Sequence, residues 1–273
     1  MKRLLVDYVS DLHLAYYLKV TKSIGFNEEE IKRFIETNIV PKIKGEILVV
    51  AGDLSEFIVS NIFFLNECSK YYKKVFYIAG NHEYYLSWII GIDMLKKYNK
   101  ISSNKIKEII SLLDGNDKVI FLDSNEPQYH GVYSYDGFTI AGDTLWYCPQ
   151  NLKDWYFYLL DSNDSHMIKK KNESQIAKIK RMHQKSMHWY ETLPEYVDLI
   201  ATHVPPLHNP HSPKEKNGCY FTPVNTIKTN TWIYGHDHIK ASFHENGCRF
   251  ISNPWGYDSK TFDIETIEIQ SSR

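Results

Sequence analysis

The chain has 273 residues, of which 43% are hydrophobic and 24% are charged, and its formal net charge is -1. This composition is ordinary for a globular enzyme, and the length suffices for one substantial core. The near-neutral charge gives no bulk attraction to nucleic acid or to anionic membranes, which argues against simple duplex binding but leaves room for a local basic patch.

Strand-like and helix-like patterns alternate through the first half of the chain. Short apolar runs rich in β-branched and aromatic residues predict buried strands at 3–9, 47–51 and 74–79. Apolar residues at helical spacing predict helices between them, at 27–40, where Asn27 is the cap, and at 56–71. This order predicts a largely parallel sheet covered by helices.

The second half mixes helical segments with short strands. A helix is predicted at 95–113, ended by polar turn residues at 114–117, and a long lysine-rich stretch at about 146–192 also has helical spacing. Strands are predicted at 118–122, 128–133, 138–141, 196–201, 231–234, 241–244, 248–251 and 262–267. The Asp-Gly pair at 136–137 and the Asn-Gly pair at 246–247 suit hairpin turns.

No internal repeat or low-complexity linker divides the sequence. The simplest architecture is one layered α/β domain over residues 1–273, containing two sheets and a helical insertion at about 146–192. The four cysteines lie far apart without a CxxC pair, which favours free thiols in a reducing compartment. With no cleavable leader and no stretch near the roughly 20 apolar residues that cross a bilayer, we expect a cytoplasmic protein without a membrane partner.

Side chains of metal-binding type follow the ends of successive predicted strands. Asp11 and His13 follow the first strand, Asp53 the second, and Asn81 and His82 the third; later in the chain His203, then His236 and His238, follow two more. The carboxyl ends of strands in an open α/β sheet form the crevice where ligands bind, so we expect these residues to meet there. Taken singly, each would be an ordinary turn residue, but five such segments together favour a site.

These segments, in this order, resemble the pattern of the calcineurin-like metallophosphoesterase superfamily. Its elements are D-x-H, GD-x-x-[D/E], GNH-[E/D], a single H and GH-x-H. They correspond here to Asp11-Leu12-His13, Gly52-Asp53-Leu54-Ser55-Glu56, Gly80-Asn81-His82-Glu83, Thr202-His203 and Gly235-His236-Asp237-His238. The resemblance implies an α/β/β/α sandwich with two mixed sheets and a binuclear metal-dependent phosphoric ester hydrolase.

The resemblance also implies a division of roles. One divalent metal ion would be held by Asp11, His13 and His238, and a second by Asn81, His203 and His236. Asp53 would bridge them, because the two oxygens of a carboxylate serve cations roughly 3.5–4 Å apart. Nitrogen and oxygen donors suit manganese, which we favour, as well as iron, zinc or nickel. A hydroxide shared by the metals would attack phosphorus directly.

His82 and Glu56 have separate implied roles. His82 would not bind metal but would act as a general acid, or as a hydrogen-bond donor, toward the leaving oxygen. Glu56 would orient His82, although a glutamate here also suits the first turn of a helix. The segments 142–146 (GDTLW) and 253–257 (NPWGY) are similar to the GxTLW and NPxGY elements of a poorly characterised microbial branch, which indicates no substrate.

The expected substrate is a phosphomonoester or phosphodiester. Two alternatives stay open: a nuclease acting on single strands or ends, and a non-catalytic binding scaffold. A nuclease would use the basic residues of 169–185 to hold the nucleic-acid backbone, whereas a solvated helix face is the interpretation favoured for them. For His208 and His211, which lie in a proline-rich loop, a solvated loop is the interpretation favoured over another metal site. The sequence does not indicate an oligomeric state.

Overall fold

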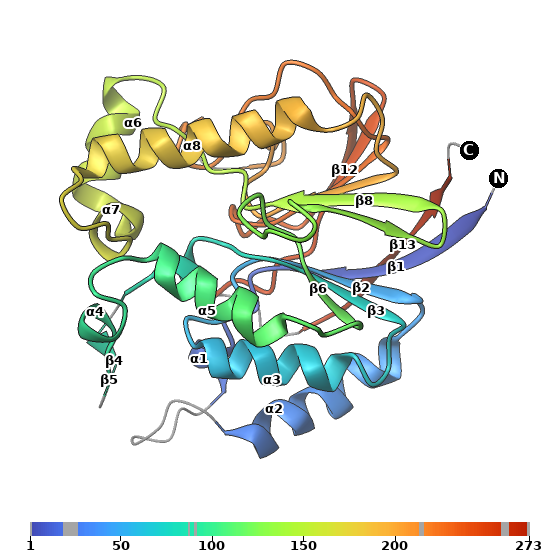
Figure 1. The fold of residues 1–273 in the computed structure, drawn as a ribbon. Coiled ribbons are helices and arrows are strands. Elements are labelled where there is room, and N and C mark those ends of the chain that lie inside the picture. The colour runs from blue at the N-terminus through green and yellow to red at the C-terminus, as the bar shows by residue number, and fades with distance from the viewer. Residues whose placement is uncertain are drawn as a thin grey trace.

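Two mixed sheets form the centre of the fold in the computed structural model, which describes residues 2–18, 27–86, 88–89, 92–212, 216–257 and 262–271 (Figure 1). The first sheet has the order β13-β1-β2-β3-β6, and only β13 runs antiparallel to its neighbour. Its strands are β1 (Arg3–Val9), β2 (Ile47–Ala51), β3 (Lys74–Ile78), β6 (Val119–Phe121) and β13 (Glu265–Gln270).

The second sheet has the order β11-β12-β10-β9-β8-β7, with parallel strands in the middle and antiparallel edges. Its strands are β7 (Val132–Tyr135), β8 (Phe138–Asp143), β9 (Leu199–Thr202), β10 (Thr231–Tyr234), β11 (Ala241–Glu245) and β12 (Cys248–Ser252). A separate two-stranded ribbon joins β4 (Trp88–Ile89) to β5 (Ile92–Asp93). The predicted pair of mixed sheets is therefore confirmed.

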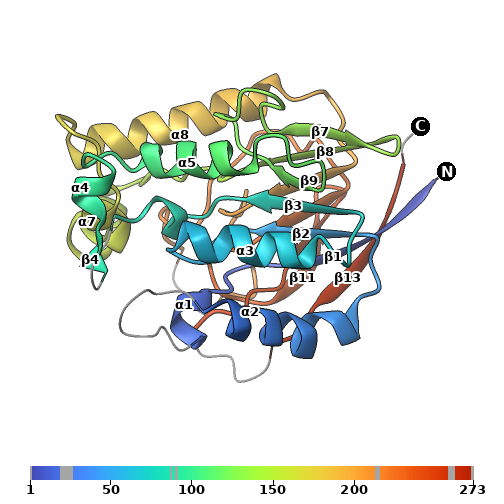
Figure 2. The same cartoon turned by 60° about the horizontal axis from the view of Figure 1, so that its bottom comes forward.

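Helices cover the outer face of each sheet. The first sheet is covered by α2 (Glu28–Phe34), α3 (Ile58–Cys68) and α5 (Ser103–Leu113), with α3 and α5 side by side (Figure 2). The second is covered by α8 (Gln175–Thr192) (Figure 1). The shorter helices are α1 (Leu14–Tyr17), α4 (Met94–Lys97), α6 (Leu152–Tyr156) and α7 (Asn163–Met167). The layers follow the predicted α/β/β/α order.

Strand alternation explains these layers, because successive side chains of a strand point to opposite faces. In β2, Ile47 and Val49 pack between the two sheets, whereas Leu48 and Val50 pack against the helices on the other side. On the second sheet, Trp232 faces outward and joins Trp189 of α8 in a separate apolar cluster. The central strands β2, β9 and β10 are thus withdrawn from water on both faces, which is the main favourable contribution to folding.

The predicted helix at 95–113 is wrong as a single element, because the chain breaks it between α4 and α5. Asn99 and Lys100 have left-handed backbones, with φ of 53° and 57°. The N–H of Lys100 donates to the carbonyl of Leu95 at 2.8 Å, which is the bond that closes a helix C-terminus. Asn tolerates this conformation better than most residues, so Asn99 was the available sequence signal.

Other boundaries also differ from the sequence predictions. The segment at 146–192 is divided because Asn151, Ser162 and Ser174 each cap a new helix with a side-chain oxygen. The strand predicted at 128–133 begins only at Val132, because the preceding turn is held by the carboxylate of Glu126. The strand predicted at 262–267 lies at Glu265–Gln270 instead. By contrast, the Asn27 cap and both predicted hairpin turns are confirmed.

The four cysteines are free thiols, as expected. Within the part of the chain that the structure describes, no helix combines the length and apolar character needed to span a bilayer.

Asp7 of β1 holds the first sheet to three neighbouring segments. Its buried carboxylate accepts hydrogen bonds from the N–H of Gly45 at 2.8 Å, from the hydroxyl of Tyr72 at 2.9 Å and from the hydroxyl of Thr266 at 2.6 Å. The donors of Gly45 and Tyr72 are buried together with their acceptor, and that of Thr266 is buried in part, so loss of the carboxylate would leave them unsatisfied.

We therefore expect Asp7→Ala to lower the free energy of unfolding by about 3 kcal/mol or more, since several buried donors lose their acceptor at once. Urea titration followed by circular dichroism measures the change. The control is Glu268→Ala, which removes an exposed carboxylate from the neighbouring strand β13 and should change stability by less than about 0.5 kcal/mol. Equal effects of the two substitutions would contradict this role of Asp7.

Candidate metal centre

The strand ends bring eight of the nine predicted site residues into one region, and the ninth, Glu56, contacts His82. Asp11 and His13 follow β1, Asp53 follows β2, and Asn81 and His82 follow β3, all parallel strands of the first sheet. His203 follows β9, and His236 and His238 follow β10, which are neighbours in the second sheet. The candidate site therefore lies where the carboxyl ends of strands from both sheets meet, whereas the sequence pattern predicted strand ends of one open sheet.

One group of donors is formed by Asp11, His13, Asp53 and His238, whose ligand atoms all lie within 4.8 Å of one another. Nε2 of His238 lies 3.3 Å from Oδ1 of Asp11 and 3.1 Å from Nε2 of His13. Three of these four residues are buried. Polar atoms this close, converging on one point, match the donor set expected for a divalent cation.

A second group is centred on the amide oxygen of Asn81. This oxygen lies 2.9 Å from Nε2 of His203 and 3.1 Å from Nδ1 of His236. Asp53 joins this group as well, because its Oδ1 lies 3.5 Å from Nε2 of His203. Its other oxygen, Oδ2, lies 3.8 Å from Nε2 of His13 in the first group. The carboxylate of Asp53 thus presents one oxygen to each group.

Hydrogen bonds fix which ring nitrogen faces the centre. His203 uses Nδ1 to donate to the carbonyl of Ala51 at 3.0 Å, so Nε2 is the nitrogen that faces the site. His236 uses Nε2 to donate to the carbonyl of Cys219 at 3.0 Å, so its Nδ1 is the acceptor. Metal-ligating histidines are oriented by bonds of this kind, and the donors present here therefore fit the predicted metals.

Asn81 is oriented by a residue that the sequence analysis missed. Asp164, at the start of the chain's α7, is 3% exposed and accepts from Nδ2 of Asn81 at 2.8 Å. The hydroxyls of Tyr85 and Tyr147 donate to the same carboxylate at 2.5 and 2.6 Å. This arrangement turns the amide oxygen of Asn81 toward the histidines. A lone Asp in a lysine-rich helical stretch gave no sequence signal for such a role.

Glu83 is a second residue whose role the sequence did not reveal. Its fully buried carboxylate accepts from the N–H groups of Asp53, Leu54 and Gly80 at 2.7–3.1 Å. It therefore ties the loop after β2 to the loop after β3. The buried ammonium of Lys105 also holds the loop after β3, because it donates to the carbonyls of His82 and Tyr85 at 3.3 and 3.1 Å. Burial lowers the pKa of Lys105 to about 8.

Five of the seven predicted ligands have left-handed backbones, with positive φ at Asp11, His13, Asp53, His236 and His238. Such conformations cost roughly 1 kcal/mol or more for a residue with a side chain, and they cluster at functional sites. Backbone bonds hold them in place: the N–H of Asp11 donates to Gly52 and that of His13 donates to Asp53, both at 3.0 Å. The ligand loops are therefore built into the fold.

Burial and charge set the protonation of the centre. Burial opposes the charge of Asp53, but His203 and His82 outweigh it and hold the pKa of this carboxyl well below its usual range. Burial lowers the pKa of His13 and of His236 to about 4, so both rings are neutral and able to bind metal. Burial also opposes the charged form of His203, but Asp53 raises its pKa to about 10, and a metal ion must displace that proton.

His82 lies beside the two groups and contacts Glu56 and Tyr257. Its Nδ1 is 3.2 Å from a carboxylate oxygen of Glu56, and its Nε2 is 3.2 Å from the hydroxyl of Tyr257. Burial would lower the pKa of His82, but Asp53 and Glu56 raise it to about 9. Glu56 precedes α3 rather than lying within it, so its position fits the orienting role that the resemblance implied.

Tyr257, the last residue of the NPWGY segment, covers one side of the site. Its ring stacks on His13, with centroids 4.3 Å apart, and its hydroxyl lies 3.3 Å from Nδ1 of that histidine. The preceding Gly256 is fixed by a backbone bond from its N–H to the carbonyl of Asp11 at 3.0 Å. The motif thus brings a phenol to the metal centre, a function that its sequence alone did not indicate.

A cleft of about 480 Å³ opens over these residues. Aromatic side chains form much of its wall, namely Tyr85, Tyr147, Phe157, Tyr220 and Tyr257. Among the lining residues that the structure describes there is no lysine or arginine, and Asp161 and Asp164 add acidic groups. His208 and His211 pack against Phe221 and Phe243 and belong to neither donor group.

Comparison with known proteins agrees with this geometry. A family model described as calcineurin-like phosphoesterase matches residues 4–240. The chain belongs to the calcineurin-like phosphoesterase family. Family membership implies a hydrolase, and members typically bind divalent metals, which the buried Asp/His cluster suits. The resemblance found in the sequence is therefore confirmed, whereas the roles of individual ligands stay predictions.

Two relatives extend over most of the chain. The uncharacterized protein L509 of Acanthamoeba polyphaga mimivirus is 25% identical over 280 residues, which cover 93% of this chain and 91% of that protein. The crystal structure of phosphopantetheinyl hydrolase (PptH) from Mycobacterium tuberculosis matches with a TM-score of 0.65 and 16% identity, covering 92% of this chain and 89% of that one. The structural match shows that the calcineurin-like phosphoesterase fold is shared.

Asp53→Asn should reduce the metal content of the purified protein below two ions per chain, because an amide offers only one oxygen and no charge to the two groups. Elemental analysis after gel filtration measures this content. Glu56→Gln makes the same chemical change beside the donors rather than among them, and it should leave the content unaltered. An Asp53→Asn protein that retains two ions would contradict the bridging position.

Proposed function

We propose that the chain is a binuclear metal-dependent phosphoric ester hydrolase that acts on a small phosphomonoester or phosphodiester. The observation that carries this proposal is the carboxylate of Asp53, which presents Oδ2 to His13 at 3.8 Å and Oδ1 to His203 at 3.5 Å. The chain belongs to a family of phosphoesterases, and its two donor groups around a shared carboxylate are the arrangement that a two-metal hydrolase requires.

Two divalent ions in these groups, manganese by preference and otherwise iron, zinc or nickel, would polarise the phosphoryl oxygens and lower the pKa of an attacking water molecule. The residues of the chain supply the rest of the chemistry. Asp53 holds its negative charge between the groups, and Asn81 contributes a neutral oxygen that limits the total charge. Cys219 is not a competing ligand, because burial raises the pKa of its thiol.

His82 supplies the proton for the leaving oxygen. Its side chain is 15% exposed, so it reaches the cleft, and Glu56 and Asp53 favour its protonated form. Its Nε2 faces the cleft beside the hydroxyl of Tyr257, while Nδ1 is engaged by Glu56. We assign Tyr257 as a positioning residue that holds this ring and the substrate oxygen next to it.

The cleft favours a small ester over a nucleic-acid strand. A strand is held mainly by cations on its phosphates, yet the described lining of this cleft has tyrosines and acids rather than lysine or arginine. The scaffold alternative is disfavoured by the complete set of donors and by His82 beside them. A cytoplasmic location and the absence of a membrane partner remain part of this proposal.

The decisive test is hydrolysis of a panel of esters by the metal-loaded protein, with manganese, iron, nickel and zinc compared. We expect turnover of small mono- or diesters and loss of that turnover after chelation, because the ions activate the nucleophile. Preferential cleavage of single-stranded oligonucleotides would support the nuclease alternative instead. A flat result across all esters and metals would support the scaffold.

His82→Ala should retain both metals but lower kcat by about 10²-fold or more on an alkyl phosphate, because the alkoxide then leaves without a proton. The loss should be much smaller on a p-nitrophenyl ester, whose leaving group needs no acid. Steady-state kinetics on the two substrates, together with metal analysis, measures the difference. An equal decrease of kcat on both substrates would contradict the role of His82 as the general acid.

A further inference from the structure

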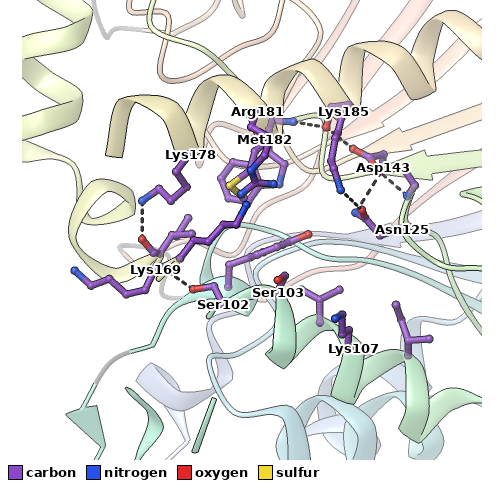
Figure 3. A pocket seen from close by; sticks show the side chains of 18 residues that line it. Ser102, Ser103, Lys107, Asn125, Asp143, Lys169, Lys178, Arg181, Met182 and Lys185 are labelled. Atoms are coloured by element: carbon purple, nitrogen blue, oxygen red, sulfur yellow. Dashed lines mark hydrogen bonds between the residues drawn. The ribbon is translucent and has the colours of Figure 1, made fainter. Parts of the chain in front are cut away.

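A second cavity lies between α5 and α8, away from the metal-centre cleft, and Figure 3 shows the side chains that line it. Its volume is about 300 Å³, and none of its lining residues lines the cleft over the metal centre. Pockets that bind small ligands begin at about this size. The cavity therefore needs its own explanation.

The floor and the rim of this cavity differ in character. Tyr84, Ile106, Trp146 and Met182 give an apolar floor, and all four are buried. The rim carries basic side chains from three separate segments, namely Lys107 of α5, Lys169 and Lys170 of the loop before α8, and Arg181 and Lys185 of α8. Among the lining residues that the structure describes, Asp143 is the only acid.

Few of these positive charges are balanced within the protein. Asp143 is 2% exposed and is occupied by the N–H groups of Ser124 and Leu145 and by the hydroxyl of Ser186, as Figure 3 shows in part. Arg181 and Lys170 share one carboxylate, that of Glu173, at 2.9 and 3.5 Å. Within the described residues, Lys107 and Lys169 have no acidic oxygen within 4.0 Å.

Lys178 is buried beside the cavity. The solvated helix face predicted for this residue is wrong, because Lys178 is 2% exposed. Its ammonium donates to the carbonyls of Asp164, Ser165 and Ile168 at 3.2, 3.4 and 2.6 Å. Burial lowers its pKa to about 8, although the negative charge of Asp164 opposes this shift.

We propose that the cavity between α5 and α8 is an effector site for a small organic anion with several phosphate groups and an apolar ring, such as a nucleoside triphosphate. The rim would bind the phosphates, whose charge matches the unbalanced cations, and the floor would contact the ring. A compact anion fits better than a polymer, because the basic residues surround one cavity instead of forming an extended track.

Two segments connect this site to the metal centre. Tyr84 of the cavity floor ends the turn that begins at His82. Trp146 precedes Tyr147, whose hydroxyl donates to the carboxylate that orients Asn81. A ligand that displaces either segment would alter the metal-centre geometry, so we expect binding to change turnover. This regulatory step rests on the proposed esterase function, whereas binding itself does not.

The test is isothermal titration of the full-length, metal-loaded protein with ATP, inorganic triphosphate and adenosine. We expect ATP to bind most tightly, triphosphate more weakly and adenosine not detectably at the same concentrations. Raising the salt concentration should weaken ATP binding, because the contacts are ionic. No binding of ATP up to millimolar concentration, or tighter binding of adenosine than of triphosphate, would overturn the proposal.

A double substitution separates this site from the metal centre, which also attracts phosphates. Lys107→Glu with Lys185→Glu changes two exposed rim positions and should weaken ATP binding at least tenfold without changing ester hydrolysis in the absence of ATP. Lys32→Glu with Arg33→Glu makes the same charge change on α2, which α3 separates from α5, and should leave ATP affinity unaltered.

The two glutamates could destabilise the fold, and the melting temperature of the variant shows whether they do. Lys107→Gln with Lys185→Gln therefore repeats the test with neutral residues. ATP affinity that is equal in wild type and in both rim variants would place the binding elsewhere and overturn the proposal. If the rim variants lose ATP affinity but the wild-type protein hydrolyses no ester, the result supports the effector site and contradicts only the proposed esterase function.

Discussion

The structure depends on holding one ionised carboxylate, that of Asp53, between two groups of donors. A buried charge is unfavourable unless hydrogen bonds and opposite charges compensate it. The N–H of His82 donates to Oδ1 of Asp53 at 2.9 Å, and the backbone of Asp53 is bound in turn by Glu83. Its negative charge draws the histidine rings together. The same charge would attract divalent cations, which would replace the protons on the ring nitrogens that face the site.

Space around this carboxylate is as constrained as charge. A side chain at Gly80 would place its Cβ 2.1 Å from Oδ1 of Asp53, and one at Gly52 would lie 2.4 Å from the ring of His203. Both distances are far below any contact that real atoms make. Gly52 of the GD element and Gly80 of the GNH element are therefore required because two loops approach one carboxylate. This steric requirement is separate from the backbone conformation of each glycine.

The sequence was sufficient for those features that depend on periodicity and strand ends. β1, β2 and β10 were predicted with their observed limits, because buried parallel strands have distinctive apolar runs and polar residues at their ends. The eight residues of the centre followed from the same reasoning. Helix breaks at Asn99 and at Ser174 were missed, because single capping residues are weak signals inside a lysine-rich helical pattern.

What the sequence could not provide was contact between distant segments. Asp164 lies 83 residues beyond Asn81 yet fixes its amide, and Tyr257 lies 175 residues beyond His82 yet contacts its ring. Neither spacing has a period, so neither could be predicted without the fold. The helical insertion predicted at about 146–192 supplies part of the wall of the cleft and, through Asp164, support for the candidate metal centre.

The left-handed backbones of five candidate ligands place stability and activity in opposition. Glycine would relax each of these positions, since it adopts positive φ without steric cost, and some of the folding free energy lost there would return. Each such change would also delete a metal donor. Selection for a more stable protein alone would therefore favour the loss of His13, His236 and His238, whereas the carboxylates of Asp11 and Asp53 also accept backbone N–H bonds and would be retained longer. A relative that had lost its catalytic task should accumulate glycine at the three histidine positions first.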